Sequence, residues 1–561
     1  MTRRNILLGS GLAALAVGSG ELLTAPQAQA RGASTAGTTL QQAATGAATG
    51  YSRLSAGPGY PLVVRDDLAA PQPGREDRRL PLASLVQLTD LHFVDAQSPM
   101  RVEWFRKVIG SAFRPQESLG TRANTSLVEA INSLARGPWS GRRFDAVVCT
   151  GDNTDNQELI ELDWYLKTLS GGQITPNTGD PARWEGVQTR NTKSFWTPES
   201  SIADEYKQAG FPQIDGFFSR VMATHSSPGL KTPWYAVFGN HDNSAQGTFP
   251  ASWKSLTKVY TGNQKLVGYA EPTDQQAAAR ALSSGTPVDL SSARTLSVTV
   301  TADPRRRPFT PTEFMAAHLD SSVTGPGPVG HGFTRQNVES GAGYYTFQLA
   351  PGITGIAMDS TNRAGFTEGS IDDRQWKWLL KTLQAGSSVY HDAVGGKHTQ
   401  QVSDQLFVLF SHHTSGSMNN LMLPADGTGI RHAGFELVDM LKRFPNVLAW
   451  VNGHTHANKI TAHQHRDPKR GFYEINTASH IDFPQLARVI EFLDNADGTL
   501  SMFTTLVESA APYQADYDTA TVAGMASLSR EFAYNDPERD LSLLGAAGDR
   551  NTELVMPHPL R

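Results

Sequence analysis

The chain has 561 residues, and 39% of them are hydrophobic, which is enough to build a substantial core at this length. Charged residues make up 18%, with 49 Lys and Arg against 54 Asp and Glu and no long basic run. A nucleic-acid polymer is therefore not expected as the main partner, because affinity for a phosphate backbone needs clustered cations. The single cysteine, Cys149, excludes a disulfide within the chain.

Residues 1–30 are predicted to be an export signal. Arg3 and Arg4 precede a weakly apolar stretch from Ile6 to Gly18, and Ala28-Gln29-Ala30 forms a small-x-small cleavage pattern. The paired arginines resemble the twin-arginine signal, which a dedicated machinery reads, and the alternative is an ordinary secretion signal. The apolar run is shorter than the roughly 20 residues of a membrane span. We therefore expect export to the cell envelope, the periplasm or the extracellular space, with no stable membrane span after signal removal.

Residues 31–80 are expected to form a low-complexity linker, because they are rich in Ala, Gly, Thr, Ser and Pro and show no apolar periodicity. Order is expected to begin near Pro81. Beyond it, apolar runs alternate with helical spacings. Strands are predicted at 83–88, 144–149 and 234–238, and helices at 126–135 and 157–169.

A polar cluster follows each of these three strands. The clusters are Asp90-Leu91-His92, Gly151-Asp152-Asn153 and Gly239-Asn240-His241-Asp242. The carboxyl ends of strands are where α/β sheets place their functional sites. The clusters are therefore candidates for one shared site.

From about residue 244 to 339 the pattern dissolves into Gly, Pro, Thr and Ser, which predicts a long insertion between core elements. Long insertions in compact enzymes often act as lids or binding loops. Regular patterning then resumes. Strands are predicted at 344–349, 353–358, 405–410 and 447–451, and helices around 376–383 and at 434–444.

Two further clusters follow the last two of these strands. They are Ser411-His412-His413 and Gly453-His454-Thr455-His456. The side chains of His454 and His456 point to the same side of an extended segment, as chelation requires. A hairpin is predicted to turn at 495–498, a helix at 520–532, and residues 516–561 form a C-terminal extension. Strands that alternate with helices predict a layered α/β architecture.

The five clusters supply carboxylate, amide and imidazole groups, which are the ligands that two cations sharing one site would need. This set suits iron, zinc or manganese better than calcium, so two divalent or trivalent ions are expected as cofactors. In two-metal hydrolysis the ions lie about 3.5–4 Å apart, and a water between them becomes the nucleophile. The natural substrate is a phosphate ester, whose oxygens carry the charge that the metals would stabilise.

At this point the chain resembles a known family. The order D-x-H, G-D, G-N-H-D, H and G-H-x-H is similar to the signature of calcineurin-like metallophosphoesterases, and it runs from about Leu85 to Val507. The resemblance is closest to exported, twin-arginine-type bacterial members. It implies a four-layer α/β/β/α sandwich, with the catalytic domain at 81–515, and hydrolysis of phosphomonoesters or phosphodiesters.

The resemblance also implies a role for each matching residue, with Asp152 bridging two metals. The first metal would be held by Asp90, His92, Asp152 and His456. The second would be held by Asp152, Asn240, His412 and His454. The side chain of His241 would stay off the metals and act on the leaving group or a phosphoryl oxygen, positioned by Asp242.

Several assignments stay open at this stage. His412 and His413 compete for one ligand role, and His412 is favoured because it comes first after its strand. Asn153 is expected to contact the phosphate. His331 in the insertion and His480 after a strand are candidates for the substrate pocket, and the alternative for each is an ordinary surface or hydrogen-bonded histidine.

The chain departs from two branches of the family. Purple acid phosphatases place a tyrosine ligand three residues after the bridging aspartate, where this chain has Asp155. Bacterial 5′-nucleotidases carry a large second domain after the last cluster, where only about a hundred residues remain. The alternative function is a non-catalytic, metal-binding envelope protein that retains the fold. A serine hydrolase is disfavoured, because the chain has no G-x-S-x-G motif.

Overall fold

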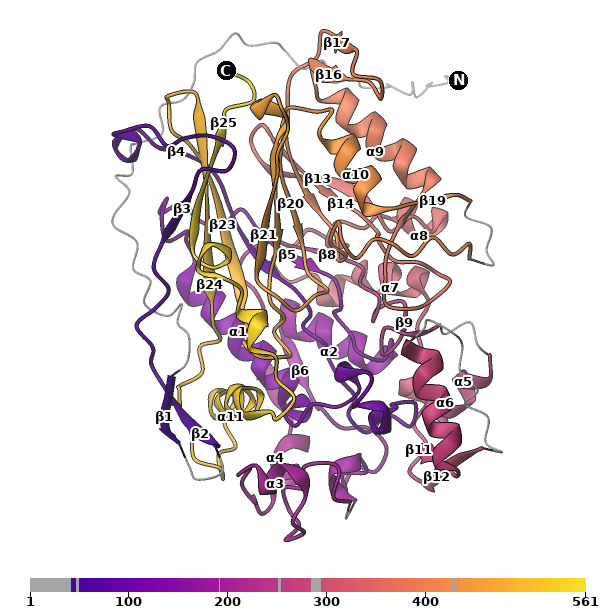
Figure 1. Ribbon diagram of the computed structural model, residues 1–561. Coiled ribbons are helices and arrows are strands. Elements are labelled where there is room, and N and C mark those ends of the chain that lie inside the picture. Colours follow the sequence, from indigo (N-terminus) through magenta and orange to yellow (C-terminus); the bar gives the residue numbers. More distant parts are fainter. Residues whose placement is uncertain (1–41, 47–49, 191, 251–253, 284–293, 425–428) are drawn as a thin grey trace, which may run out of the picture.

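The computed structural model describes residues 42–46, 50–190, 192–250, 254–283, 294–424 and 429–561. In this part of the chain two mixed sheets pack face to face (Figure 1). One has seven strands in the order β3-β25-β24-β23-β4-β5-β8, and the other has six in the order β13-β14-β18-β20-β22-β21. The predicted export signal, residues 1–30, lies outside the described residues.

The seven-stranded sheet combines a parallel half with an antiparallel half. Strands β4, β5 and β8 run parallel, and β23, β24 and β25 continue the sheet in antiparallel order. Its strands are β3 (Val63–Arg65), β4 (Leu80–Leu88), β5 (Ala146–Thr150), β8 (Trp234–Val237), β23 (Ala487–Asp494), β24 (Thr499–Val507) and β25 (Thr552–Pro557).

Four strands of the six-stranded sheet, β14, β18, β20 and β22, run parallel. The sheet consists of β13 (Tyr345–Ala350), β14 (Ile353–Ala357), β18 (Leu406–Phe410), β20 (Val447–Asn452), β21 (Lys459–His463) and β22 (Phe472–Asn476). Strands β5 and β18 are buried along their whole length and read as continuous apolar runs. Such runs are typical of parallel strands that are covered on both faces.

Helices cover the outer faces of both sheets (Figure 1). Helices α1 (Gly120–Leu134) and α2 (Leu159–Ser170) join the large core cluster that also contains both sheets. Helices α9 (Asp373–Ala385) and α10 (Gly434–Leu441) pack on the six-stranded sheet through a second cluster. The predicted four-layer α/β/β/α arrangement is therefore confirmed.

The remaining elements are short, belong to the long connection between β8 and β13, or, in the case of α11, lie between β24 and β25. The helices are α3 (Glu205–Gln208), α4 (Phe217–Met222), α5 (Lys254–Thr261), α6 (Pro272–Ser283), α7 (Pro311–His318), α8 (Arg335–Ser340) and α11 (Val522–Asn535). The strands are β1 (Gln42–Gly46), β2 (Ser52–Ser55), β6 (Gly172–Ile174), β7 (His225–Ser227), β9 (Ser244–Ala245), β10 (Phe249–Pro250), β11 (Gln264–Tyr269), β12 (Thr295–Thr299), β15 (Ile371–Asp372), β16 (Val389–His391), β17 (Lys397–Thr399) and β19 (Arg431–His432).

Both ends of the predicted catalytic domain need correction. Strand β3, which falls in the predicted linker 31–80, pairs in parallel with β25, which falls in the predicted extension 516–561. Strand β25 also pairs with β24. The sheet therefore draws on both segments, and short strands whose partners are distant in sequence carry no local signal that shows this.

The predicted insertion, 244–339, has regular structure of its own in the described residues. Strands β11 and β12 form an antiparallel pair, and Tyr260 and Tyr269 pack with Phe105 and Met100 in a separate hydrophobic cluster. The insertion thus has a core that it shares with the loop after β4. Among the residues with described structure, no helix has the length and apolar character to cross a membrane.

Candidate metal centre

All five polar clusters come together at one edge of the sandwich. Those around Asp90, Asp152 and Asn240 follow β4, β5 and β8 of one sheet, and those around His412 and His454 follow β18 and β20 of the other. Hydrogen bonds between the loops join the two sets. The ring of His412 donates through Nδ1 to the Thr150 carbonyl, 2.9 Å away, and the amide of His454 donates to Asp90 Oδ2 at 3.1 Å.

The loops approach so closely that a glycine is needed at Gly453. A Cβ atom at this position would lie 1.9 Å from Thr89 Oγ1 and 2.5 Å from Asp90 Oδ2. Both distances are far below van der Waals contact. Gly453 therefore allows the loop after β20 to lie against the loop after β4.

Backbone strain is concentrated in the candidate ligands. Five of them have a positive φ, a region that non-glycine residues seldom adopt. They are Asp90 (50°), His92 (41°), Asp152 (50°), His454 (73°) and His456 (55°). Strain of this kind costs on the order of 1–3 kcal/mol per residue and is retained where the surrounding structure imposes it, often at functional sites.

The first group of ligand atoms surrounds Asp90 Oδ1. This oxygen lies 3.2 Å from His456 Nε2 and 4.0 Å from His92 Nε2, which in turn is 3.8 Å from Asp152 Oδ2. Asp90 Oδ1 and His92 Nε2 are both buried and have no hydrogen-bond partner among the described residues. Buried polar atoms are nearly always satisfied, so this pair indicates a missing ligand such as a metal ion.

The second group surrounds Asn240 Oδ1. This atom lies 3.0 Å from His412 Nε2 and 3.1 Å from His454 Nδ1. Asp152 Oδ2 is 3.1 Å from His412 Nε2, so Asp152 is shared by both groups. The other oxygen of Asp152 accepts a 2.8 Å bond from the His241 amide, which fixes the carboxylate. The ligand atoms of Asp90, Asp152 and His412 lie within 4.8 Å of one another.

The hydrogen bonds of His412 and His413 differ. Nδ1 of His412 donates to a backbone carbonyl, and its Nε2 faces the cluster, 3.1 Å from Asp152 Oδ2. His413 uses both nitrogens elsewhere: Nε2 donates to the Thr367 carbonyl at 2.9 Å, and Nδ1 accepts from the Ser360 hydroxyl at 2.8 Å. The ring of His413 nevertheless lies beside that of His454, with centroids 4.4 Å apart. One ring nitrogen from each of His412, His413 and His454 lies within 4.8 Å of the others, so the preference for His412 stays a prediction.

Opposite charges stabilise one another inside the cluster. Burial by itself would lower the pKa of the imidazoles, but Asp90 raises that of His456 to about 10, and Asp152 raises that of His412 to about 9. Burial would raise the pKa of Asp90, yet these histidines hold it at about 2. The carboxylates are therefore ionised, the form that binds cations, whereas these two imidazoles would give up a proton to bind one.

The ring of His241 faces the cluster without belonging to either group. Its Nδ1 donates to the Asp155 carbonyl at 2.9 Å, and its Nε2 lies 4.0 Å from Asp152 Oδ2. The side chain is 5% exposed. This placement suits a group that acts on a substrate beside the ligands.

The prediction that Asp242 positions the His241 ring is wrong. The Asp242 carboxylate instead accepts bonds from the backbone amides of Gly239, Asn153 and Thr154, at 2.9 to 3.2 Å. It turns back into its own loop and ties that loop to the one after β5. The ring of His241 is held by Asp155 instead.

Asn153, predicted to contact the phosphate, is a structural residue. Its side chain is fully buried, and Nδ2 donates to the Val237 carbonyl and to Asp242 Oδ2, both at 3.0 Å. These bonds turn the amide into the protein and away from the ligand atoms. Sequence proximity to Asp152 suggested the contact, but the chain turns after β5, and Asp152 has a positive φ of 50°.

His331 and His480 do not line the centre either. The ring of His331 stacks on Trp234 with centroids 3.5 Å apart, and its Nδ1 lies 2.9 Å from Nδ1 of His318. The ring of His480 turns to the Ala123 carbonyl in α1, 3.3 Å away. Both histidines are buried core residues, and burial of this kind depends on packing that a sequence pattern does not reveal.

Two carboxylates behind the centre were missed. Asp155 Oδ1 lies 2.9 Å from His92 Nδ1, and Asp482 Oδ2 lies 2.7 Å from His456 Nδ1. Asp155 follows Asp152 by three residues in the same loop, and a second acid in that loop was an available signal. Asp482 has no local signal, because its partner comes from another strand.

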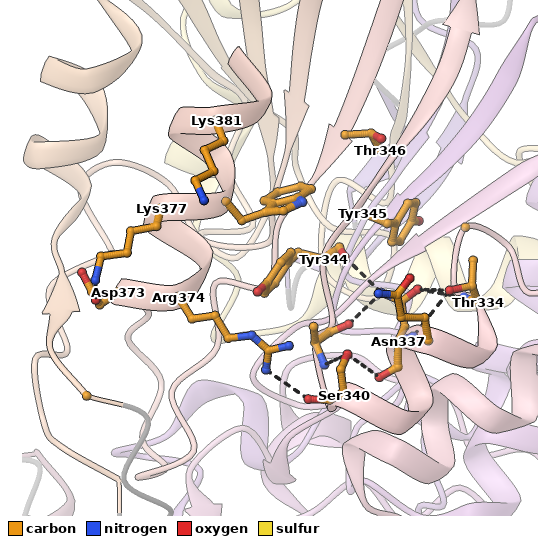
Figure 2. Close-up of a pocket in the computed structure, with 15 residues that line it drawn as sticks. Thr334, Asn337, Ser340, Tyr344, Tyr345, Thr346, Asp373, Arg374, Lys377 and Lys381 are labelled. Atoms are coloured by element: carbon orange, nitrogen blue, oxygen red, sulfur yellow. Dashed lines mark hydrogen bonds and ion pairs between the residues drawn. The ribbon is translucent and has the colours of Figure 1, made fainter. Parts of the chain in front are cut away.

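A cavity of about 850 Å³ lies elsewhere, between α8, β13 and α9 (Figure 2). Arg374, Lys377 and Lys381 line it together with Tyr344 and Trp378, whose ring centroids are 4.6 Å apart. None of the candidate ligands lines this cavity. Its lining has no group of acids and imidazoles that could hold a metal, so we assign the chemistry to the cluster at the strand ends.

Comparisons with known proteins give little beyond this geometry. No protein-family model matches the chain, and no curated protein matches it. Among solved structures, a dimetal phosphatase from Danio rerio is similar with a TM-score of 0.34 and 9% identity, over 77% of this chain and 100% of that chain. The sulfate thiohydrolase SoxB from Thermus thermophilus gives 0.28 and 11%, over 77% and 57%. Such TM-scores carry no argument, so the assignments rest on topology and geometry.

Proposed function

We propose that the protein is a dinuclear, metal-dependent phosphoesterase of the calcineurin-like type. The observation that carries the proposal is the convergence of ligand atoms around Asp152 Oδ2. Beside it lie the buried atoms Asp90 Oδ1 and His92 Nε2, which make no hydrogen bond among the described residues. Carboxylate, amide and imidazole donors on both sides of one shared carboxylate fit two transition-metal ions. Iron, zinc and manganese all suit this donor set.

The residues divide into two sets of ligands and one acting group. The first ion would be held by Asp90, His92, Asp152 and His456. The second ion would be held by Asp152, Asn240, His412 and His454. When bound, the ions would polarise the phosphoryl oxygens and lower the pKa of the attacking water.

His241 contributes the remaining chemistry. Its Nδ1 is fixed on the Asp155 carbonyl, so Nε2 faces the place where a phosphoryl or leaving-group oxygen would lie. A proton on Nε2 can then be donated to that oxygen. The substrate is a phosphomonoester or phosphodiester, and the half-buried His454 and His456 mark the side from which it enters.

The test measures the metal-dependent cleavage of aryl phosphate monoesters and diesters. The metal content of the same preparations is measured alongside. Asp152→Asn is expected to lose metal and activity together. His241→Ala is expected to keep both ions and lose about 10²- to 10⁴-fold in kcat, the usual contribution of a general acid. His398→Ala is the matched control, since this exposed histidine pairs with Asp392 at 3.0 Å and stacks on Tyr390.

The proposal fails if the metal-loaded protein cleaves no ester in a panel of nucleotides, phospholipid head groups and sugar phosphates. Two bound ions without turnover, and a His241→Ala variant that matches the parent, would instead favour a non-catalytic metal-binding protein. A preference for diesters over monoesters in the same panel would define the branch of the family.

We also propose export through the twin-arginine machinery, to the envelope or beyond. The support is the sequence of residues 1–30, with the arginine pair at Arg3 and Arg4. Replacement of both by lysine is expected to retain the protein in the cytoplasm, measured by cell fractionation. Unchanged export of that variant would point to an ordinary secretion signal.

A further inference from the structure

Both histidines of the first group are backed by a carboxylate. His92 Nδ1 donates to Asp155 Oδ1 and His456 Nδ1 to Asp482 Oδ2, at 2.9 and 2.7 Å. Each bond turns Nδ1 to the outer carboxylate and Nε2 towards Asp90. Outer carboxylates of this kind orient a histidine ring and make it a better metal ligand.

One buried arginine connects the two carboxylates. Arg114 donates from Nε to Asp482 Oδ1 at 2.6 Å and from Nη2 to Asp482 Oδ2 at 3.1 Å, while its Nη1 lies 3.6 Å from Asp155 Oδ1. Its side chain is 2% exposed. A two-pronged pair of this type fixes the angle of a carboxylate as well as its position.

Arg114 is itself held in place. Its backbone amide donates to Glu117 Oε2 at 3.0 Å, and its Nη1 donates to the Ser111 carbonyl at 3.1 Å. Glu117 also pairs with Arg101, which donates to the other oxygen of Asp155. The arginine therefore belongs to a buried, ordered network and has little freedom to turn away.

The second group has no such support. Nδ1 of His412 faces the uncharged carbonyl of Thr150, and the group includes the neutral amide of Asn240. Neither His412 nor His454 has a hydrogen bond to an outer carboxylate among the described residues. The two groups thus differ in what lies behind them.

We propose that Arg114 is a positioning residue for the first metal site. By holding Asp482 and contacting Asp155, this one side chain sets the orientation of both His92 and His456. The proposal rests on the proposed function, because it presupposes two metal sites. Without Arg114, the Asp482 side chain, which is 27% exposed, can turn to solvent and release His456. Asp155 would keep Arg101 but lose the contact that ties it to Asp482.

The expected effect is selective for one ion. Loss of one outer partner usually costs 10- to 100-fold in metal affinity. Because Arg114 serves two ligands, Arg114→Met is expected to weaken the first site by about 100-fold or more and leave the second unchanged. Arg114→Lys offers one point charge in place of a fork, so an intermediate loss is expected.

The experiment is a Co²⁺ titration of the full chain after a chelator has removed its metal. Binding is measured by calorimetry and by the visible absorption of the bound ion. The parent should bind two ions, Arg114→Met one ion at the parental affinity, and Arg114→Lys one ion tightly and one weakly. The matched control is Arg122→Met, which removes another buried arginine whose bonds go to the backbone carbonyls of Val221, Arg220 and Ala223. This control should bind two ions as the parent does.

Each outcome is decisive. Two ions bound by Arg114→Met with parental affinities would overturn the inference and leave the proposed function intact. A parent that binds no ion would end the proposed function itself. If circular dichroism shows Arg114→Met to be unfolded, Asp482→Asn takes its place, since it keeps the shape and removes the charge. That variant should also lose affinity for one ion only, and parental binding by it would refute the proposal.

Discussion

At the scale of single residues, the centre depends on carboxylates that have one oxygen fixed by hydrogen bonds and the other facing the cluster. Asp90 Oδ2 is held by Thr89 and by the His454 amide, while Oδ1 faces the cluster. Asp152 is divided in the same way, with Oδ1 on the His241 amide. A carboxylate arranged like this is oriented before any ligand arrives, which lowers the entropy cost of binding.

Gly453→Ala tests how closely the loops must approach. The added Cβ would lie 1.9 Å from Thr89 Oγ1, so Thr89 and Asp90 must move. We expect at least about a 100-fold loss in kcat, since a shift of 1 Å in a reacting group can cost that much. Denaturant unfolding should show a loss of about 1–3 kcal/mol from overpacking. Gly110→Ala is the control, because a Cβ there meets nothing within 4 Å, and equal activity of both variants would contradict the prediction.

Asp242→Ala tests whether this carboxylate has a structural role. Its loss would leave the buried amides of Gly239, Asn153 and Thr154 without their acceptor. Unsatisfied buried donors cost about 1–3 kcal/mol each, so we expect a loss of about 3 kcal/mol or more in the free energy of unfolding. His241→Ala should unfold near the parental midpoint. A fully stable Asp242→Ala variant with reduced turnover would restore the role first predicted for it.

At the scale of elements, the connection between β8 and β13 carries the pair His318 and His331. The two rings meet through their Nδ1 atoms, and His331 stacks on Trp234 at the start of β8. Burial lowers the pKa of His331 to about 4 and that of His318 well below its usual value. Both are therefore neutral in the folded protein near neutral pH, and the packing of α7 against β8 requires them to stay so.

This pair of histidines predicts that the free energy of unfolding decreases as the pH falls. The pKa of His331 is lower in the folded state than its ordinary value of 6.5, so between pH 6.5 and 4 only the unfolded chain takes up the proton. Stability is complete above pH 6.5 and is lost as the pH falls towards 4. From pH 7 to pH 5 one such group contributes a loss of about 2 kcal/mol.

The measurement is denaturant unfolding at both pH values for the parent and for His331→Phe. The phenyl ring can keep the stacking on Trp234 but cannot titrate. The variant is expected to be less stable at pH 7, because His318 loses its partner, yet to show a smaller difference between the two pH values. An equal difference in both proteins would show that His331 does not contribute.

At the scale of the whole molecule, one edge of the seven-stranded sheet is formed by two segments that are far apart in the sequence. Strand β25 lies between β24 and β3 in the seven-stranded sheet, and Leu554, Val555 and Met556 are buried in it. Residues 552–556 are thus part of the core. They also bring the segment around β3, near the start of the described chain, against the same sheet.

Deletion of residues 552–561 is therefore expected to prevent folding. The deletion removes buried apolar side chains and leaves the edge of β24 unpaired, which favours aggregation. Soluble yield and circular dichroism are the measurements. Deletion of 559–561 alone, which removes only exposed or half-buried residues, is the control and should leave the fold intact. A soluble, active protein without β25 would show that the sheet is complete without it.

The sequence by itself determined the layered architecture and most of the candidate ligands. Parallel strands such as β5 and β18 are continuous apolar runs, and each ligand cluster follows directly after its strand. Both signals are local, so they can be read without knowing the partners. The preference for His412 over His413 stays a prediction, which the 3.1 Å distance from His412 Nε2 to Asp152 Oδ2 favours.

Only the tertiary structure decided the rest. Asp482 and Arg114 meet across 368 positions of chain, and no pattern near either residue marks the contact. His331 and His480 looked like candidates in sequence and are core residues, because burial depends on which distant surface covers a side chain. Strand β3 has only three residues, and its partner β25 lies almost 490 positions away in the chain. Local periodicity fixes what a segment can form, whereas contacts between segments fix what surrounds it.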